Sequence, residues 1–107
     1  MYNNISLNDG TILKIESIEF DIYLTYQNWK EEINTIIFID AIYLEVLNAI
    51  KAESGDLSVE TDDQKIFEIC EKIEEPAANY KLFKIFSAWN WDNKLIEVIA
   101  KDVKAII

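Results

Sequence analysis

The chain has 107 residues, of which 50% are hydrophobic and 28% charged, and its formal net charge is −10 at pH 7. This length and composition predict one folded domain, residues 1–107, with a single modest core, and they exclude a disordered chain. The sequence has no histidine and no arginine. It therefore excludes serine–histidine and cysteine–histidine catalysis, and its acidity argues against binding to nucleic acid, whose phosphates carry the same charge.

The start of the chain, Met1-Tyr2-Asn3-Asn4, shows neither a basic nor an apolar leader. The most apolar window, residues 33–50, contains Asp40 and Glu45 near its middle. A secretion signal and a membrane-spanning helix are both unexpected in such a sequence. We therefore expect a cytoplasmic protein that does not enter a membrane.

The first part of the chain alternates apolar and polar residues, which predicts β-strands. Asn8-Asp9-Gly10 lies between two apolar runs and predicts a hairpin with a type I′ turn. The alternation over residues 18–26 predicts a strand with one wet face, and the change of apolar parity before it predicts a bulge or bend at Glu16-Ser17. The continuous apolar run at residues 36–39 predicts a buried central strand.

The segment from Asp40 to Ala52 fits two structures. Its apolar residues recur at helical spacing, with Asp40 as a candidate N-cap, yet the residues up to Val46 also alternate as they do in a strand. We favour a helix here, and a long strand through Val46 is the alternative.

A helix is predicted from Asp62 to about Glu75, after a short strand at residues 57–59. Thr61 to Gln64 matches a capping box, in which the threonine hydroxyl accepts from an unpaired N–H group. The apolar residues that follow form one stripe, and Pro76 ends the helix.

The C-terminal segment, residues 80–107, predicts a β-hairpin. Two apolar runs flank the polar residues 90–93, and such a pattern around Asn and Asp is typical of a hairpin loop. Together the elements predict an α+β domain, in which an antiparallel sheet of about five to six strands has one or two helices packed on one face.

Negative charge is concentrated in the middle of the chain. Residues 53–79 hold nine acids and two lysines, a net charge of −7, whereas residues 80–107 have a net charge of +2. Like charges three or four residues apart on a helix each cost about 0.2–0.5 kcal/mol, so the fold does not require this crowding. We interpret it as a surface for a basic protein partner, and a solvated face that keeps the protein soluble is the alternative.

Tryptophans near the predicted hairpin tip are candidate apolar anchors, because tryptophan is enriched at the centres of interfaces. The alternative is that they cover the edge of the core. The candidate partner-binding residues are Glu53, Asp56, Glu60, Asp63, Glu68, Glu71, Glu74, Glu75, Trp89 and Trp91.

The sequence offers no catalytic set. With only two glycines, Gly10 and Gly55, it has no glycine-rich phosphate loop. Cys70 lies on the apolar stripe of the predicted helix, which predicts a buried thiol rather than a nucleophile. No spacing selects a catalytic pair from the 20 acids. We therefore predict a protein that is not an enzyme and that binds no metal and no cofactor.

In its size, its acidity, its lack of a catalytic set and its predicted layout, the whole chain resembles the small immunity proteins of bacterial toxin systems. This resemblance implies a cytoplasmic inhibitor that neutralises a cognate basic toxin domain, often a nuclease, by presenting carboxylates where the toxin expects phosphates. Two other classes of function stay open. One is a small-molecule-binding or enzymatic domain with its site between sheet and helix, and the other is a structural or oligomerising module that pairs through an edge strand such as residues 96–101.

Overall fold

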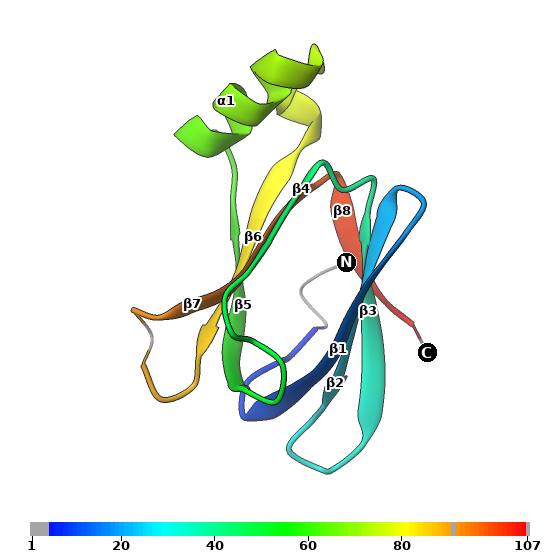
Figure 1. Ribbon diagram of the computed structural model, residues 1–107, viewed down its shortest axis with the longest axis vertical. Coiled ribbons are helices and arrows are strands. Elements are labelled where there is room, and N and C mark those ends of the chain that lie inside the picture. The colour runs from blue at the N-terminus through cyan, green and yellow to red at the C-terminus, as the bar shows by residue number, and fades with distance from the viewer. Residues whose placement is uncertain (1–4, 91, 107) are drawn as a thin grey trace.

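The computed structural model of the chain describes residues 5–90 and 92–106. These residues form eight β-strands, one α-helix and one 3-10 helix (Figure 1). The elements are β1 (Gly10–Ile18), β2 (Asp21–Gln27), β3 (Ile33–Ile39), β4 (Tyr43–Val46), β5 (Glu53–Glu60), α1 (Gln64–Ile73), η2 (Ala77–Asn79), β6 (Lys81–Ser87), β7 (Lys94–Ala100) and β8 (Asp102–Ile106).

All eight strands belong to one antiparallel sheet with the order β4-β7-β6-β5-β1-β2-β3-β8. The pairing between β5 and β1 extends over only two residue pairs, Gly10 with Ser54 and Thr11 with Glu53. Most other neighbouring strands pair over four to seven residues. The sheet therefore folds at this short contact into two four-stranded halves, which lie on opposite sides of the core (Figure 1).

Two segments carry the chain from one half of the sheet to the other. β3 continues through residues 40–42 into β4, and β7 continues through Lys101 into β8. The N–H of Lys101 donates to the C=O of Ile39 at 2.9 Å, and the N–H of Ile42 donates to the C=O of Ile99 at 2.8 Å. Because the two bends are bonded to each other, both of these N–H groups are paired where the sheet turns a corner.

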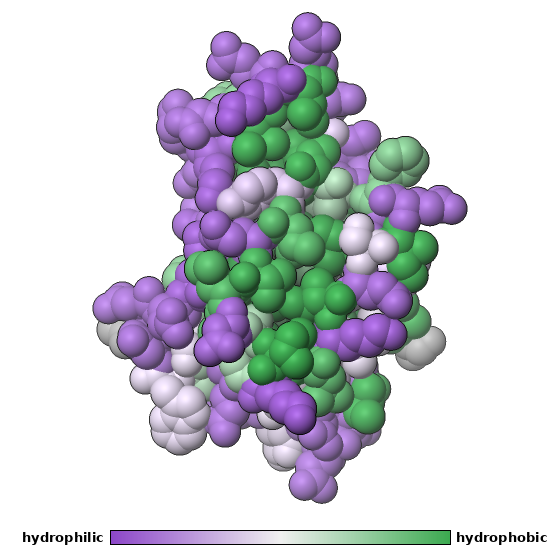
Figure 2. Space-filling model, viewed as in Figure 1, coloured by the Kyte–Doolittle hydropathy of each residue, from purple (hydrophilic) through white to green (hydrophobic). Residues whose placement is uncertain are grey.

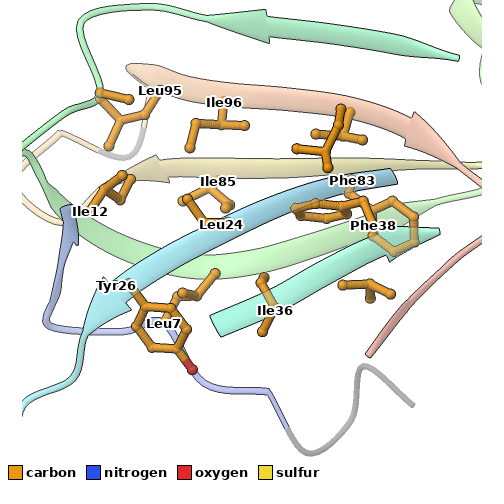
Figure 3. Close-up of a cluster of buried hydrophobic side chains, with 14 of the residues drawn as sticks. Leu7, Ile12, Leu24, Tyr26, Ile36, Phe38, Phe83, Ile85, Leu95 and Ile96 are labelled. Atoms are coloured by element: carbon orange, nitrogen blue, oxygen red, sulfur yellow. The ribbon is translucent and has the colours of Figure 1, made fainter. Parts of the chain in front are cut away.

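The core fills the space between the two halves (Figure 3). Phe38 on β3 and Phe83 on β6 meet there with their ring centroids 5.4 Å apart and their planes tilted by 58°. Both rings are 1% exposed. Burying an aliphatic or aromatic side chain of this size contributes about 1.5–3 kcal/mol, so this cluster is the main force that holds the halves together.

Helix α1 lies at one end of the molecule, beyond the ends of β5 and β6 (Figure 1). Its buried residues, Ile66 and Cys70, pack in a second cluster with Leu82 of β6 and Ile99 of β7. The helix ends at Glu74, which takes the left-handed conformation (φ 58°) and directs its N–H to the carbonyls of the last turn.

Several predictions from the sequence are confirmed. The strand predicted at residues 36–39 is the C-terminal part of β3, and residues 57–59 lie in β5. The apolar runs of the C-terminal segment pair as β6 and β7, and α1 lies within the predicted helix. The N-cap differs by two residues. Asp63, rather than Thr61, accepts a hydrogen bond from the Lys65 N–H at 2.8 Å.

The predicted fold class is wrong: the protein is richer in strands than an α+β domain with five to six strands and one or two helices. Two strands account for the difference. Residues 43–46, within the segment for which a helix was favoured, form the edge strand β4, so the alternative of a strand through Val46 is correct there. The last strand, β8, is separated from β7 by the bend at Lys101 and pairs with β3. Residues 96–101 are accordingly not an edge, because β7 lies between β4 and β6.

The predicted turns are also shifted. The segment around Asn8-Asp9-Gly10 leads into β1 and is not a type I′ hairpin, since Gly10 does not take a positive φ. A Cβ on Gly10 would lie 2.9 Å from the C=O of Gln27, so glycine is needed there for space. The first hairpin turns instead at Glu19 and Phe20, within the predicted strand of residues 18–26, and the register shift in β1 lies between Ile12 and Lys14 rather than at Glu16-Ser17.

Candidate partner-binding surface

Four of the candidate carboxylates lie together at the end of the molecule that carries α1. They are exposed, and within the described residues none of them lies within 4.0 Å of a lysine ammonium group. A helix of ten residues is about 15 Å long, so these side chains share a compact surface. We call this group the helix carboxylates; its members are Glu68, Glu71, Glu74 and Glu75.

The other candidate acids are placed differently. Glu60 pairs with Lys84 at 3.4 Å, and the Asp63 side chain caps α1. Glu53 and Asp56 are exposed in the first part of β5, which is the end of that strand farther from α1. The structure therefore divides the acidic segment into helix carboxylates, two acids with structural contacts, and a separate pair on β5.

The tryptophan anchor predicted at the hairpin tip does not lie beside the helix carboxylates. Trp89 follows the end of β6 and is 81% exposed, so it does not cover the core edge. The N–H of its neighbour Ala88 donates to the C=O of Glu53 at 3.0 Å. β6 spans about 23 Å over its seven residues, so Trp89 lies at the opposite end of the sheet from α1. Trp91 is outside the described residues.

A cleft of about 300 Å³ opens beside the C-terminal end of α1. It is formed by the β1–β2 turn, the link from β3 to β4, the segment after α1, the start of β6 and the bend between β7 and β8. Glu75, one of the helix carboxylates, lies on its wall. The complete lining is Phe20, Asp40, Ala41, Ile42, Glu75, Tyr80 and Lys101.

Phe20 is the exposed aromatic group of this cleft. Its side chain is 75% exposed at the tip of the first hairpin. The sequence pattern placed Phe20 on the apolar face of a strand, so the sequence did not indicate it as a candidate binding residue. Such a ring gains hydrophobic free energy only when another surface covers it.

The electrostatics of the cleft are dominated by carboxylates. The Lys101 Nζ lies 3.5 Å from Asp40 Oδ2 and 5.8 Å from the centre of the Tyr80 ring. Burial raises the pKa of Tyr80, and the Glu75 carboxylate raises it further. Lys101 pairs with Asp40, whereas no lysine ammonium group lies within 4.0 Å of the Glu75 carboxylate in the described structure.

The walls of the cleft are held by two hydrogen bonds that backbone N–H groups donate. The N–H of Ala41 donates to the C=O of Phe20 at 2.7 Å, and the N–H of Asp40 donates to the Asp21 carboxylate at 2.9 Å. Asp40 itself has a φ of 50°, which is rare for a residue other than glycine. Such a conformation persists where the surroundings fix the backbone, and here the two hydrogen bonds hold the link from β3 to β4 against the first hairpin.

A separate ionic network connects α1 to the sheet. The carboxylate of Glu97, a residue that is 2% exposed, accepts a hydrogen bond from the Lys65 ammonium and lies 3.2 Å from Lys94 Nζ. Lys94 also pairs with Glu45 at 3.0 Å. The hydrogen bond to Glu97 raises the pKa of Lys65. Since every carboxylate here already has a cation, this network is structural and offers no free charge to a partner.

The described residues give no support for a metal or thiol site. Across residues 5–90 and 92–106, no three acidic or thiol side chains come close enough together to hold a metal ion. Cys70 is buried, as predicted, and burial raises the pKa of its thiol.

A second exposed surface is apolar. Figure 2 shows a continuous apolar area on the middle of one face, bordered by hydrophilic residues. β4 and the turn after it expose four apolar side chains, and β4 is an edge of the sheet as far as the chain is described. These side chains are Leu44, Val46, Leu47 and Ile50.

Comparison of the chain with known protein families, with curated proteins and with solved structures finds no significant match. Within the part of the chain that the structure describes, α1 is the one α-helix, and it is neither long nor apolar enough to cross a membrane.

Proposed function

We propose that the protein is an immunity-type inhibitor that binds a basic toxin domain, of the nuclease class, in the cytoplasm and neutralises it without catalysis. The observation that carries this proposal is the surface at the α1 end, where four exposed carboxylates adjoin a cleft with an exposed Phe20, and where none of the four has a lysine ammonium group within 4.0 Å among the described residues. Charge alone supplies little affinity, and an aromatic group that becomes buried adds to it.

The physical basis of the proposal is an imbalance of charge. Lysines elsewhere in the chain pair with Glu16, Glu60 and Glu97, among others, but those four helix carboxylates stay open to solvent. α1 also carries one exposed lysine, Lys72, in its last turn, so the surface has four carboxylates and one ammonium group. A predominantly negative surface of this kind attracts an oppositely charged protein and raises its association rate by about 10- to 1000-fold at low salt. A nuclease domain carries such positive charge in its substrate groove, since it must bind phosphates.

The test is neutralisation of a defined toxin. The protein encoded beside this gene is expressed under an inducible promoter, and arrest of growth is scored with and without co-expression of the chain. The proposal predicts that co-expression restores growth and that the purified proteins bind more weakly as salt rises from about 0.05 to about 0.5 M, because the Debye length falls several-fold. If the two proteins do not bind, or if binding is independent of salt, the proposed surface is wrong.

The exposed edge strand β4 favours a second candidate function, a module that associates with its own copies. Edge strands with apolar side chains pair readily with other strands. Light scattering over a hundredfold range of protein concentration tests it: a mass that rises with concentration, and that stays monomeric after Val46→Lys, supports self-association, whereas a constant monomer excludes it.

A further inference from the structure

The cleft beside α1 combines three properties that together select a ligand. It has an aromatic ring that is 75% exposed (Phe20), a carboxylate with no lysine ammonium group within 4.0 Å in the described structure (Glu75), and walls that are held by hydrogen bonds from backbone N–H groups. Among the described residues, Lys101 carries the one ammonium group on its lining, and this group is paired with Asp40. The free part of the cleft is therefore apolar on one side and negatively charged on another.

We propose that this cleft receives an arginine side chain of the basic partner, with the guanidinium group against the Phe20 ring and paired with the Glu75 carboxylate. This inference rests on the proposed function, because it specifies what the partner inserts at the same surface. It also makes Phe20, rather than Trp89, the aromatic group that contacts the partner at the α1 end.

Arginine fits these groups better than lysine does. Its guanidinium group is planar, stacks on aromatic rings and donates two parallel hydrogen bonds to one carboxylate. It is also less strongly hydrated than an ammonium group, so its entry into a half-enclosed cleft costs less free energy. The volume of about 300 Å³ exceeds that of one side chain and leaves room for the flanking backbone of a partner.

Lys101 sets the direction from which the arginine enters. Its ammonium group repels a second cation and holds Asp40 in an ion pair at 3.5 Å. A guanidinium group is therefore favoured on the Glu75 side of the cleft. Replacement of Lys101 by methionine removes the repulsion, frees the Asp40 carboxylate and increases the affinity for arginine, whereas a cleft that binds anions would lose affinity in the same variant.

The test uses the intact chain and short blocked peptides as probes. An Ala-Arg-Ala peptide with both ends blocked is titrated against the ¹⁵N-labelled protein, with matched peptides that carry citrulline or lysine at the central position. We expect saturable shifts of the Phe20, Ala41 and Glu75 amide signals with the arginine peptide, weaker shifts with lysine, and none with uncharged citrulline. Equal shifts with citrulline, or shifts confined to other parts of the chain, would overturn the inference.

Variants separate the contributions of the ring and the charge. Phe20→Ala and Glu75→Gln each lower the affinity for the arginine peptide by about two- to fivefold, as expected for an exposed cation–π contact and an exposed ion pair. Lys101→Met raises it by a similar factor. Both replaced side chains in the first two variants are exposed, so folding is retained, and an unchanged affinity in both variants would also overturn the inference.

The outcome is distinguishable from failure of the proposed function. Glu68 and Glu71 do not line the cleft. If Glu68→Lys with Glu71→Lys weakens binding of the toxin while Phe20→Ala leaves it unchanged, the surface is correct and the arginine inference is wrong. If toxin binding is unaffected by the lysine variant, the proposed surface itself is wrong, whatever the peptides do.

Discussion

Replacement of Glu97 by glutamine tests the one buried charge in the described structure. Glu97 lies on β7, with its carboxylate between Lys65 of α1 and Lys94. The substitution keeps the shape of the side chain and removes its charge. It leaves the two ammonium groups facing an amide, which can accept a hydrogen bond through only one of its two polar atoms.

The magnitude follows from the burial of the three groups. The Glu97 side chain is 3% exposed, whereas those of Lys65 and Lys94 are 32% and 25% exposed. Breaking a fully buried ion pair costs about 3–5 kcal/mol. Water reaches both lysines after the change, and Lys94 keeps Glu45 as a partner, so we expect a loss of about 2 kcal/mol. For a chain of 107 residues this corresponds to a fall in Tm of about 9 °C.

The assay is urea denaturation followed by tryptophan fluorescence, with thermal unfolding as a second measurement. Glu16→Gln is the matched control, because Glu16 pairs with Lys14 at 3.4 Å and both side chains are about half exposed or more. The control changes the free energy of unfolding by less than about 0.5 kcal/mol. If Glu97→Gln has no larger effect than this control, the network does not hold α1 to the sheet in the way described.

Three further predictions concern pH, the start of α1 and its end. The pKa of Lys65 is raised in the folded state, so its pairing with Glu97 contributes fully to the free energy of unfolding below about pH 10. This contribution is lost as the pH rises through the pKa of the folded state. The difference in unfolding free energy between wild type and Glu97→Gln, measured by urea denaturation, is therefore constant from about pH 7 to 9.5 and shrinks above about pH 10.5. Asp63→Ala lowers the unfolding free energy by about 1 kcal/mol, and Thr61→Ala changes it by much less, because Asp63 is the residue that caps α1. Glu74→Gly raises the urea midpoint by an amount equivalent to about 0.5–1 kcal/mol while Glu74→Ala gives no gain, since φ is 58° at this position.

Local patterns in the sequence were sufficient where one element determines its own structure. The apolar stripe and the proline after it located α1, and the two apolar runs around Asn90 located β6 and β7. The N-cap was misplaced because Thr61 and Asp63 are both favourable capping residues. Only the backbone geometry, extended at Asp63 and left-handed at Asp62, decides between them.

Local patterns failed where distant parts of the chain decide. The residues of β4 fit both a helix, which the spacing favoured, and a strand, and pairing with β7 selects the strand. The turn at Glu19 and Phe20 contains no glycine, asparagine or proline, so nothing in the sequence interrupts the alternation there. The cleft was also not predictable from local patterns. Its lining comes from five segments that meet only after the sheet has folded on itself.

Reversal of charge on the helix tests the central claim most directly. The affinity of the toxin that the co-expression test identifies is measured by calorimetry for the wild type, for Glu68→Lys with Glu71→Lys, and for Glu53→Lys with Asp56→Lys, which makes the same charge change at the other end of β5. The account predicts a loss of about tenfold or more for the helix variant at low salt, little change for the β5 variant, and a smaller difference between them at high salt. Equal affinities for the two variants would contradict it.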